Sequence, residues 1–275
     1  MRLGVFDSGI GGLTVLRAIR RRWPGHATVY LGDTARVPYG IKSRQTVIHY
    51  ARQNTRLLLA EAVDLLVIAC NTASAFALEA LRDLPVPVVG VIEPGAAAAV
   101  GATRSGRIGV IGTAATIASG AYEAAIRRLA PAARVSSRAC PLLVPLAEEG
   151  WETTAVARAT LERYLEGWLP APASDPETPD VLVLGCTHYP VFKPLLSELL
   201  GPGITLIDSA DAVAAALAPW LDAAPPEPAP GHRLLVTDAA DGFARAARRL
   251  LGETVIDLQV VDLLPAVADK QLQEG

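Results

Sequence analysis

The sequence has little lysine and no excess of basic charge. Lysine occurs only at positions 42, 193 and 270 of the 275 residues. The 25 lysine and arginine residues are matched by 28 acidic residues, so the formal net charge is −3. Without a basic surplus to collect phosphates, the chain is not expected to be a dedicated nucleic-acid binder.

Cysteines and long apolar runs are also scarce. The three cysteines are an odd number with long gaps between them, which argues against a secreted disulfide framework and against a zinc site. The longest nearly uncharged run, residues 86–102, contains Glu93 and falls short of a membrane span, and the N-terminus lacks a signal-peptide pattern. These absences predict a soluble, cytoplasmic protein with no membrane partner and no metal site.

Apolar residues are plentiful, at 51% of the chain. A chain of this length and composition buries most of the surface that its unfolded form exposes, which excludes disorder for the bulk of it. The length alone suits one large domain or two smaller ones.

Short apolar runs alternate with longer stretches of helical period. The predicted strands are 2–6, 28–31, 65–69, 86–92, 107–111, 181–184, 205–207 and 234–237. The predicted helices are 14–22, 45–62, 74–82, 118–129, 154–165, 193–200, 212–221 and 242–251. Apolar runs without polar alternation are typical of parallel strands buried on both faces, so this order predicts an α/β fold.

The chain also contains an internal repeat. The strands that begin at positions 2, 64 and 90 resemble those at 107, 180 and 205, at offsets of 105, 116 and 115 residues. Three pairs in one order favour a duplicated unit over chance likeness of buried strands. We therefore expect two similar, pseudo-symmetric α/β lobes with mostly parallel sheets and the active site in the cleft between them. The expected lobes are residues 1–96 with 208–275, and residues 97–207.

Two of the cysteines, Cys70 and Cys186, each follow an apolar strand and precede a predicted helix. Ligands of open α/β sheets bind at the carboxyl ends of the strands, and a helix N-terminus lowers the pKa of a thiol. Asn71, Thr72 and Thr187 add polar groups that suit a substrate carboxylate. A buried free cysteine is often only a small hydrophobic residue, but two at equivalent strand ends favour a functional pair.

The residues next to Cys140 in the sequence do not form a polar motif, so Cys140 is assigned to the core. The Asp7-Ser8-Gly9-Ile10-Gly11-Gly12 segment lacks the dinucleotide fingerprint, because a leading carboxylate repels a pyrophosphate. Asp7 suits an ammonium group or a nearby thiol instead, or it caps a helix. The Pro38-Tyr39-Gly40 turn offers a phenol and amides. His188 alone among the four histidines lies in a motif with a cysteine.

Several of these segments together closely resemble glutamate racemases, from Arg2 to about Asp208. The motifs that carry the resemblance are Asp7-Ser8-Gly9, Pro38-Tyr39-Gly40, Ala69-Cys70-Asn71-Thr72-Ala73, Gly112-Thr113 through Thr116, Val144 to Glu148, and Gly185-Cys186-Thr187-His188-Tyr189-Pro190. The resemblance implies interconversion of L- and D-glutamate without a cofactor, supply of D-glutamate for peptidoglycan and hence cell shape, and a homodimer.

The resemblance also implies roles for individual residues. Cys70 and Cys186 would be the proton-transfer pair, assisted by Asp7, His188 and Glu148, and less securely by Asp33. Glu149 is the other candidate for the position of Glu148. The residues implied to bind substrate are Asp7, Ser8, Tyr39, Gly40, Asn71, Thr72, Thr113, Thr116, Thr187 and His188.

The chemistry agrees with this reading. Racemisation removes a hydrogen from one face of Cα and returns a proton to the other, which needs an acid and a base on opposite faces. A pyridoxal enzyme needs a Schiff-base lysine, and none of the three lysines ends a strand. The alternatives are an aspartate-, hydantoin- or maleate-type relative, and a non-catalytic protein that binds an anion and senses oxidants through its thiols.

Overall fold

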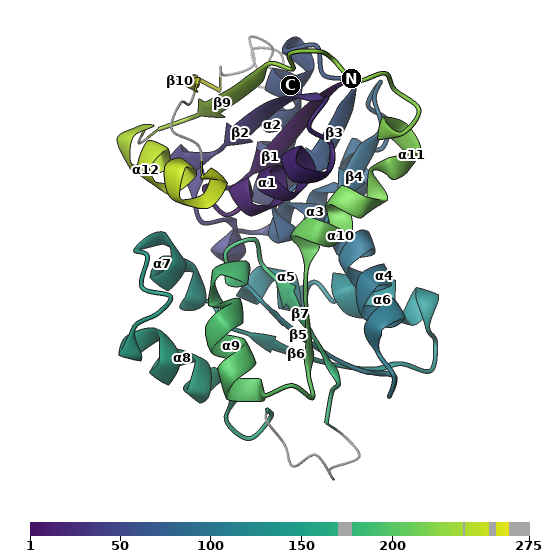
Figure 1. Cartoon of the computed structure of the whole chain (residues 1–275), viewed down its shortest axis with the longest axis vertical. Coiled ribbons are helices and arrows are strands. Elements are labelled where there is room, and N and C mark those ends of the chain that lie inside the picture. The colour runs from purple at the N-terminus through teal and green to yellow at the C-terminus, as the bar shows by residue number, and fades with distance from the viewer. Residues whose placement is uncertain (170–177, 239, 253–256, 264–275) are drawn as a thin grey trace, which may run out of the picture.

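The computed structural model describes residues 1–169, 178–238, 240–252 and 257–263. These residues form two β-sheets, stacked as an upper and a lower half in Figure 1, with helices on both faces of each sheet. All strand pairs within the two sheets are parallel. The predicted α/β class with two parallel sheets is confirmed.

The first sheet has six strands in the order β10-β9-β2-β1-β3-β4. Their bounds are β1 Arg2–Asp7, β2 Ala27–Gly32, β3 Leu65–Ile68, β4 Val88–Gly90, β9 His232–Val236 and β10 Leu258–Val260. Every residue of β2 and β3 is buried, as expected for central parallel strands covered by helices on both faces. The helices of this half are α1 Leu13–Arg22, α2 Arg44–Ala60, α3 Asn71–Ala77, α11 Ala218–Leu221 and α12 Ala240–Leu251.

The second sheet has four strands in the order β6-β5-β7-β8. Their bounds are β5 Arg107–Gly112, β6 Arg134–Ala139, β7 Val181–Gly185 and β8 Thr205–Asp208. The helices around it are α5 Ala114–Ala118, α6 Ala121–Leu129, α7 Leu143–Glu148, α8 Ala155–Leu165 and α9 Lys193–Leu200. The strands that the repeat relates, β1 to β5, β3 to β7 and β4 to β8, hold the same relative places in the two sheets, which agrees with a duplicated unit.

Two helices join the halves, α4 Ile92–Ala102 and α10 Ser209–Ala216. Helix α10 packs on α1 and α4, and α4 packs on α6 and β7, so one hydrophobic core extends from the first sheet into the second. On this basis we propose the lobes 1–96 with 208–275 and 97–207. The first boundary falls within α4 itself.

Sequence periodicity missed several elements at the margins of the sheets. Strand β6 has the sequence RVSSRA and is only half-buried at the edge of its sheet, so it lacks an apolar run. Strand β10 is a short edge strand of three residues. The predicted strand 86–92 is wrong at its C-terminal end, because β4 ends at Gly90 and α4 begins at Ile92. Among the helices that the structure describes, none has the length and apolarity needed to cross a bilayer.

Candidate active site

One narrow cavity lies between the halves, at the carboxyl ends of β1, β3, β5 and β7. It is lined by Ser8, Val37, Pro38, Tyr39, Gly40, Cys70, Asn71 and Thr72 from the first half, and by Thr113, Val144, Cys186, Thr187 and His188 from the second. Its volume of about 20 Å³ has room for about one water molecule. The structure therefore brings Cys70 and Cys186 to one enclosed space.

Cys70 lies between β3 and α3 and caps the N-terminus of that helix. Its sulfur accepts a hydrogen bond from the Ala73 amide at 3.5 Å and lies 3.7 Å from Ser8 Oγ. The expected fall in its pKa is wrong: burial, followed by the negative charge of Asp7, raises the pKa to about 12 despite the contact with the helix N-terminus. The Cys70 thiol is therefore protonated at neutral pH.

Cys186 follows β7 and faces His188 instead. The Cys186 sulfur lies 3.7 Å from His188 Nδ1, and His188 Nε2 lies 3.2 Å from Glu148 Oε1 at the end of α7. Burial alone lowers the pKa of His188, but its hydrogen bonds with Cys186 and Glu148 and the charge of Asp7 raise it to about 10. A cationic imidazole therefore stands beside the Cys186 sulfur at neutral pH.

Asp7 ends β1 and is completely buried. Its carboxylate accepts a hydrogen bond from the Gly9 amide at 3.0 Å and one from the Thr187 hydroxyl at 3.4 Å. Burial raises its pKa, and the charge of His188 opposes that rise. The carboxylate thus reaches across to the second half.

The glycines after Asp7 let the halves approach closely. A Cβ on Gly11 would lie 2.3 Å from Thr187 Oγ1 and 2.7 Å from His188 Nδ1. A Cβ on Gly40 would likewise lie 2.7 Å from Thr113 Cβ. The sequence indicated for Gly11 only that its segment lacks the dinucleotide fingerprint, because a contact across the halves leaves no local signal.

The Thr72 and Thr113 hydroxyls and the Asn71 amide line the cavity, whereas Thr116 is not among the lining residues. The hydroxyls of Thr72, Thr113 and Thr116 lie within 3.0–3.1 Å of one another across the two halves. The side-chain amide nitrogen of Asn71 is buried and lacks a hydrogen-bond partner within the described part of the chain. These donors suit an acceptor-only group such as a carboxylate.

Tyr39 lines the cavity, but its hydroxyl is already engaged elsewhere. The hydroxyl donates to Asp33 and accepts from Asn54 Nδ2 at 3.1 Å. Asp33 in turn holds Arg36 through an ion pair of 2.7 Å and does not line the cavity. Asp33 and Tyr39 therefore stabilise the loop that carries Pro38 and Gly40. Because the Tyr39 hydroxyl is bonded to Asp33 and Asn54, this geometry does not support the predicted contact between the phenol and the substrate.

The structure also distinguishes between Glu148 and Glu149 and places Cys140. Glu148 and Glu149 are both exposed, but Glu148, as preferred from the sequence, is the one with a described contact to His188. Cys140 is buried in the core of the second half, with its sulfur 3.7 Å from the Arg138 carbonyl oxygen.

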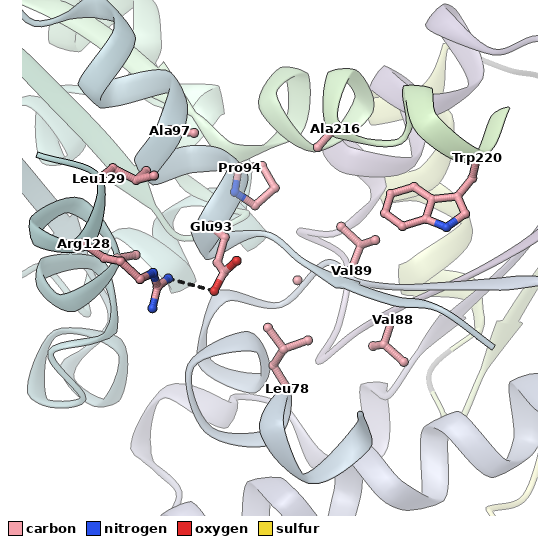
Figure 2. A pocket seen from close by; sticks show the side chains of 12 residues that line it. Leu78, Val88, Val89, Glu93, Pro94, Ala97, Arg128, Leu129, Ala216 and Trp220 are labelled. Atoms are coloured by element: carbon pink, nitrogen blue, oxygen red, sulfur yellow. Dashed lines mark hydrogen bonds and ion pairs between the residues drawn. The ribbon is translucent and has the colours of Figure 1, made fainter. Parts of the chain in front are cut away.

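A larger cavity of about 420 Å³ lies elsewhere, between β4, α4, α6 and the α10–α11 segment (Figure 2). Its walls are mainly apolar, and Glu93 forms an ion pair with Arg128 at 2.9 Å at one side. The described residues that line it include neither a thiol nor an imidazole. The candidate chemistry therefore belongs to the small cavity.

Comparison with known proteins gives a consistent result. The model of the family described as Asp/Glu/hydantoin racemase matches residues 13–217. A glutamate racemase from Geobacter metallireducens is 49% identical over 266 residues, covering 95% of this chain and 96% of that protein. The crystal structure of a glutamate racemase isoform from Bacillus anthracis superposes with a TM-score of 0.89 at 40% identity, over 95% of this chain and 97% of that one. The glutamate racemase from Francisella tularensis in complex with D-glutamate gives 0.87 at 33% identity, over 95% and 97%.

Proposed function

This chain belongs to the Asp/Glu/hydantoin racemase family and is an isomerase, and we propose that it interconverts L- and D-glutamate through Cys70 and Cys186. The observation that carries the proposal is that these two thiols come from corresponding strand ends of the two halves and line one cavity. Two acid–base groups placed on opposite sides of a substrate are what inversion at a carbon atom requires.

The two thiols have different neighbours. In one direction Cys186, beside the His188 cation, is the base that removes the Cα hydrogen, while Cys70 holds the proton delivered to the opposite face. In the reverse direction the roles exchange. Glu148 supports the charge on His188. The Asp7 carboxylate is buried and is not among the residues that line the cavity, so it would assist the thiols and attract the substrate ammonium group through its charge.

Substrate recognition follows from the polar lining. The Asn71 Nδ2 group and the hydroxyls of Thr72 and Thr113 would donate to a carboxylate, and Thr116, which hydrogen-bonds both threonine hydroxyls, would orient them. Ser8, Gly40, Thr187 and His188 complete the enclosure, and the cavity must widen to admit an amino acid. Closure around the substrate then excludes water from the carbanionic intermediate.

The proposed reaction needs no cofactor. Of the described lysines, Lys42 follows the short helix Tyr39–Ile41 and Lys193 pairs with Asp208, so neither lines the cavity. Lys270 lies outside the described residues. The family resemblance further supports a cytoplasmic homodimer that supplies D-glutamate for peptidoglycan and cell shape.

The direct test is incubation of the purified protein with L-glutamate in buffer alone. Chiral chromatography is expected to reveal an equal mixture of the two enantiomers, while L-aspartate stays essentially unchanged. A requirement for added pyridoxal phosphate would overturn the cofactor-free reaction, and faster conversion of aspartate would overturn the choice of substrate. Reactive thiols without turnover of either amino acid would favour the thiol-sensor alternative.

We expect Glu148→Gln to change the pH dependence of turnover. Removing the carboxylate charge lowers the pKa of His188 from about 10, so the cation is lost at lower pH. The basic limb of kcat/KM should move down by about one pH unit, because the Glu148 side chain is 35% exposed and partly screened. Glu149→Gln, at the adjacent exposed position, is the matched control and should leave the limb in place. Identical profiles for wild type and Glu148→Gln would contradict the assisting role of Glu148.

A further inference from the structure

Tyr122 is a buried residue of α6 that the sequence analysis did not single out. Its hydroxyl donates to Asn71 Oδ1 at 2.7 Å, across the boundary between the halves. Asn71 directly follows Cys70 and lines the cavity. Tyr122 therefore contacts the site from behind without facing the substrate cavity.

The same tyrosine also contacts the segment of the other cysteine. A Cβ on Gly185, the residue before Cys186, would lie 3.0 Å from Cε2 of the Tyr122 ring. The ring is thus packed against the backbone that carries Cys186, while its hydroxyl holds the residue after Cys70. One side chain touches the immediate neighbours of both thiols.

The hydrogen bond from Tyr122 decides which end of the Asn71 amide faces the cavity. With Oδ1 turned to the tyrosine hydroxyl, the buried Nδ2 has no partner in the described part of the protein. A buried amide N–H without a partner is energetically unfavourable, so this atom is available for an acceptor. A carboxylate supplies acceptors only, and the opposite orientation of the amide would present a second acceptor to it.

Ser209, the first residue of α10, is a second hydrogen-bond partner of the Tyr122 hydroxyl. Because the tyrosine donates its hydrogen to Asn71, Ser209 is the donor in this second bond. Burial raises the pKa of Tyr122, so the hydroxyl keeps its proton across the working pH range. Ser209, Tyr122 and Asn71 form one chain of hydrogen bonds from α10 through α6 to α3.

We infer that Tyr122 is a positioning residue that orients the Asn71 amide toward a substrate carboxylate and spaces the two cysteine-bearing segments. The inference rests on the proposed glutamate racemisation and names a residue on which that reaction depends. It assigns the hydroxyl to substrate affinity and the ring to the spacing of the thiols. The two parts of the side chain are therefore separable by substitution.

Tyr122→Phe keeps the ring and removes only the hydroxyl. The KM for glutamate should rise about tenfold, as for loss of one well-placed hydrogen bond to a charged group, while kcat stays within a few fold. Tyr189→Phe is the matched control, because Tyr189 is equally buried and its hydroxyl donates to the Cys140 carbonyl oxygen at 2.8 Å, away from Asn71. The control should lose comparable thermal stability without the rise in KM.

A double-mutant cycle with Asn71→Ala distinguishes positioning from general support of the fold. If Tyr122 acts through Asn71, Tyr122→Phe should add nothing to the KM of Asn71→Ala. If the effects of Tyr122→Phe and Asn71→Ala on KM multiply, or if an active and folded Tyr122→Phe variant has an unchanged KM, the inference about Tyr122 is overturned while the proposed function stands. Ser209→Ala is the second variant and should raise the KM for glutamate less than Tyr122→Phe does. If Tyr122→Phe folds poorly and Ser209→Ala leaves the KM unchanged, the inference is also overturned. A wild-type protein that does not racemise glutamate would overturn the proposed function first.

Discussion

Replacement of either Cys70 or Cys186 with alanine is expected to abolish racemisation, whereas Cys140→Ala should keep turnover within a few fold. The first two thiols line the cavity from opposite halves, and each variant removes the group that serves one face of the substrate. A general acid or base typically contributes 10²–10⁴-fold, so each loss should be at least of that order.

Cys140→Ala serves as the internal control for this pair. Cys140 is also buried, but its sulfur contacts only the Arg138 carbonyl among the hydrogen-bond partners described for it. All three variants should be compared at matched folded fractions, measured by circular dichroism, so that loss of stability is not mistaken for loss of chemistry. A reduction of less than tenfold at either Cys70 or Cys186 would count against its assigned role.

The broad architecture could be predicted from the sequence because buried parallel strands leave a strong local signal. The pairs β1 with β5 and β3 with β7 stood out as repeats of apolar runs, and they are central in both sheets. The edge strand β6 could not be found this way, because a half-buried edge needs no continuous apolar run. Helix α4 was obscured for a related reason: its run of small apolar residues has no polar face to reveal a helical period.

The positions of the thiols were predictable for a geometric reason. Parallel strands send their carboxyl ends to one edge of a sheet, so residues that follow β3 and β7 meet when two such edges face each other. The properties of those thiols were not predictable. The high pKa of Cys70 depends on burial and on Asp7, which arrives from a different strand.

Contacts between residues distant in sequence could not be predicted from the sequence either. The hydroxyl of Tyr39 turns to Asp33 and Asn54, and Tyr122 reaches Asn71 from the other half. Neither contact has a spacing or composition that marks it in the sequence. Such partners decide which atoms of a motif face the substrate and which support it from behind.

The hydrogen on the product is expected to come from solvent. If Cys70 and Cys186 stand on opposite faces of the bound Cα, the thiolate that accepts the substrate hydrogen cannot deliver it to the other face. The opposing thiol, already equilibrated with solvent, makes that delivery. The remaining substrate should stay nearly unlabelled, because a thiol that has taken one proton can return only that proton.

The most direct test of the two-thiol account is therefore conversion of L-glutamate in D₂O, stopped at low conversion, with the enantiomers separated and analysed by mass spectrometry or NMR. The account predicts deuterium at Cα of the newly formed D-glutamate, little in the remaining L-glutamate, and the same pattern when D-glutamate is the substrate. Retention of the original hydrogen in the new enantiomer would mean that one base serves both faces, and would contradict the account.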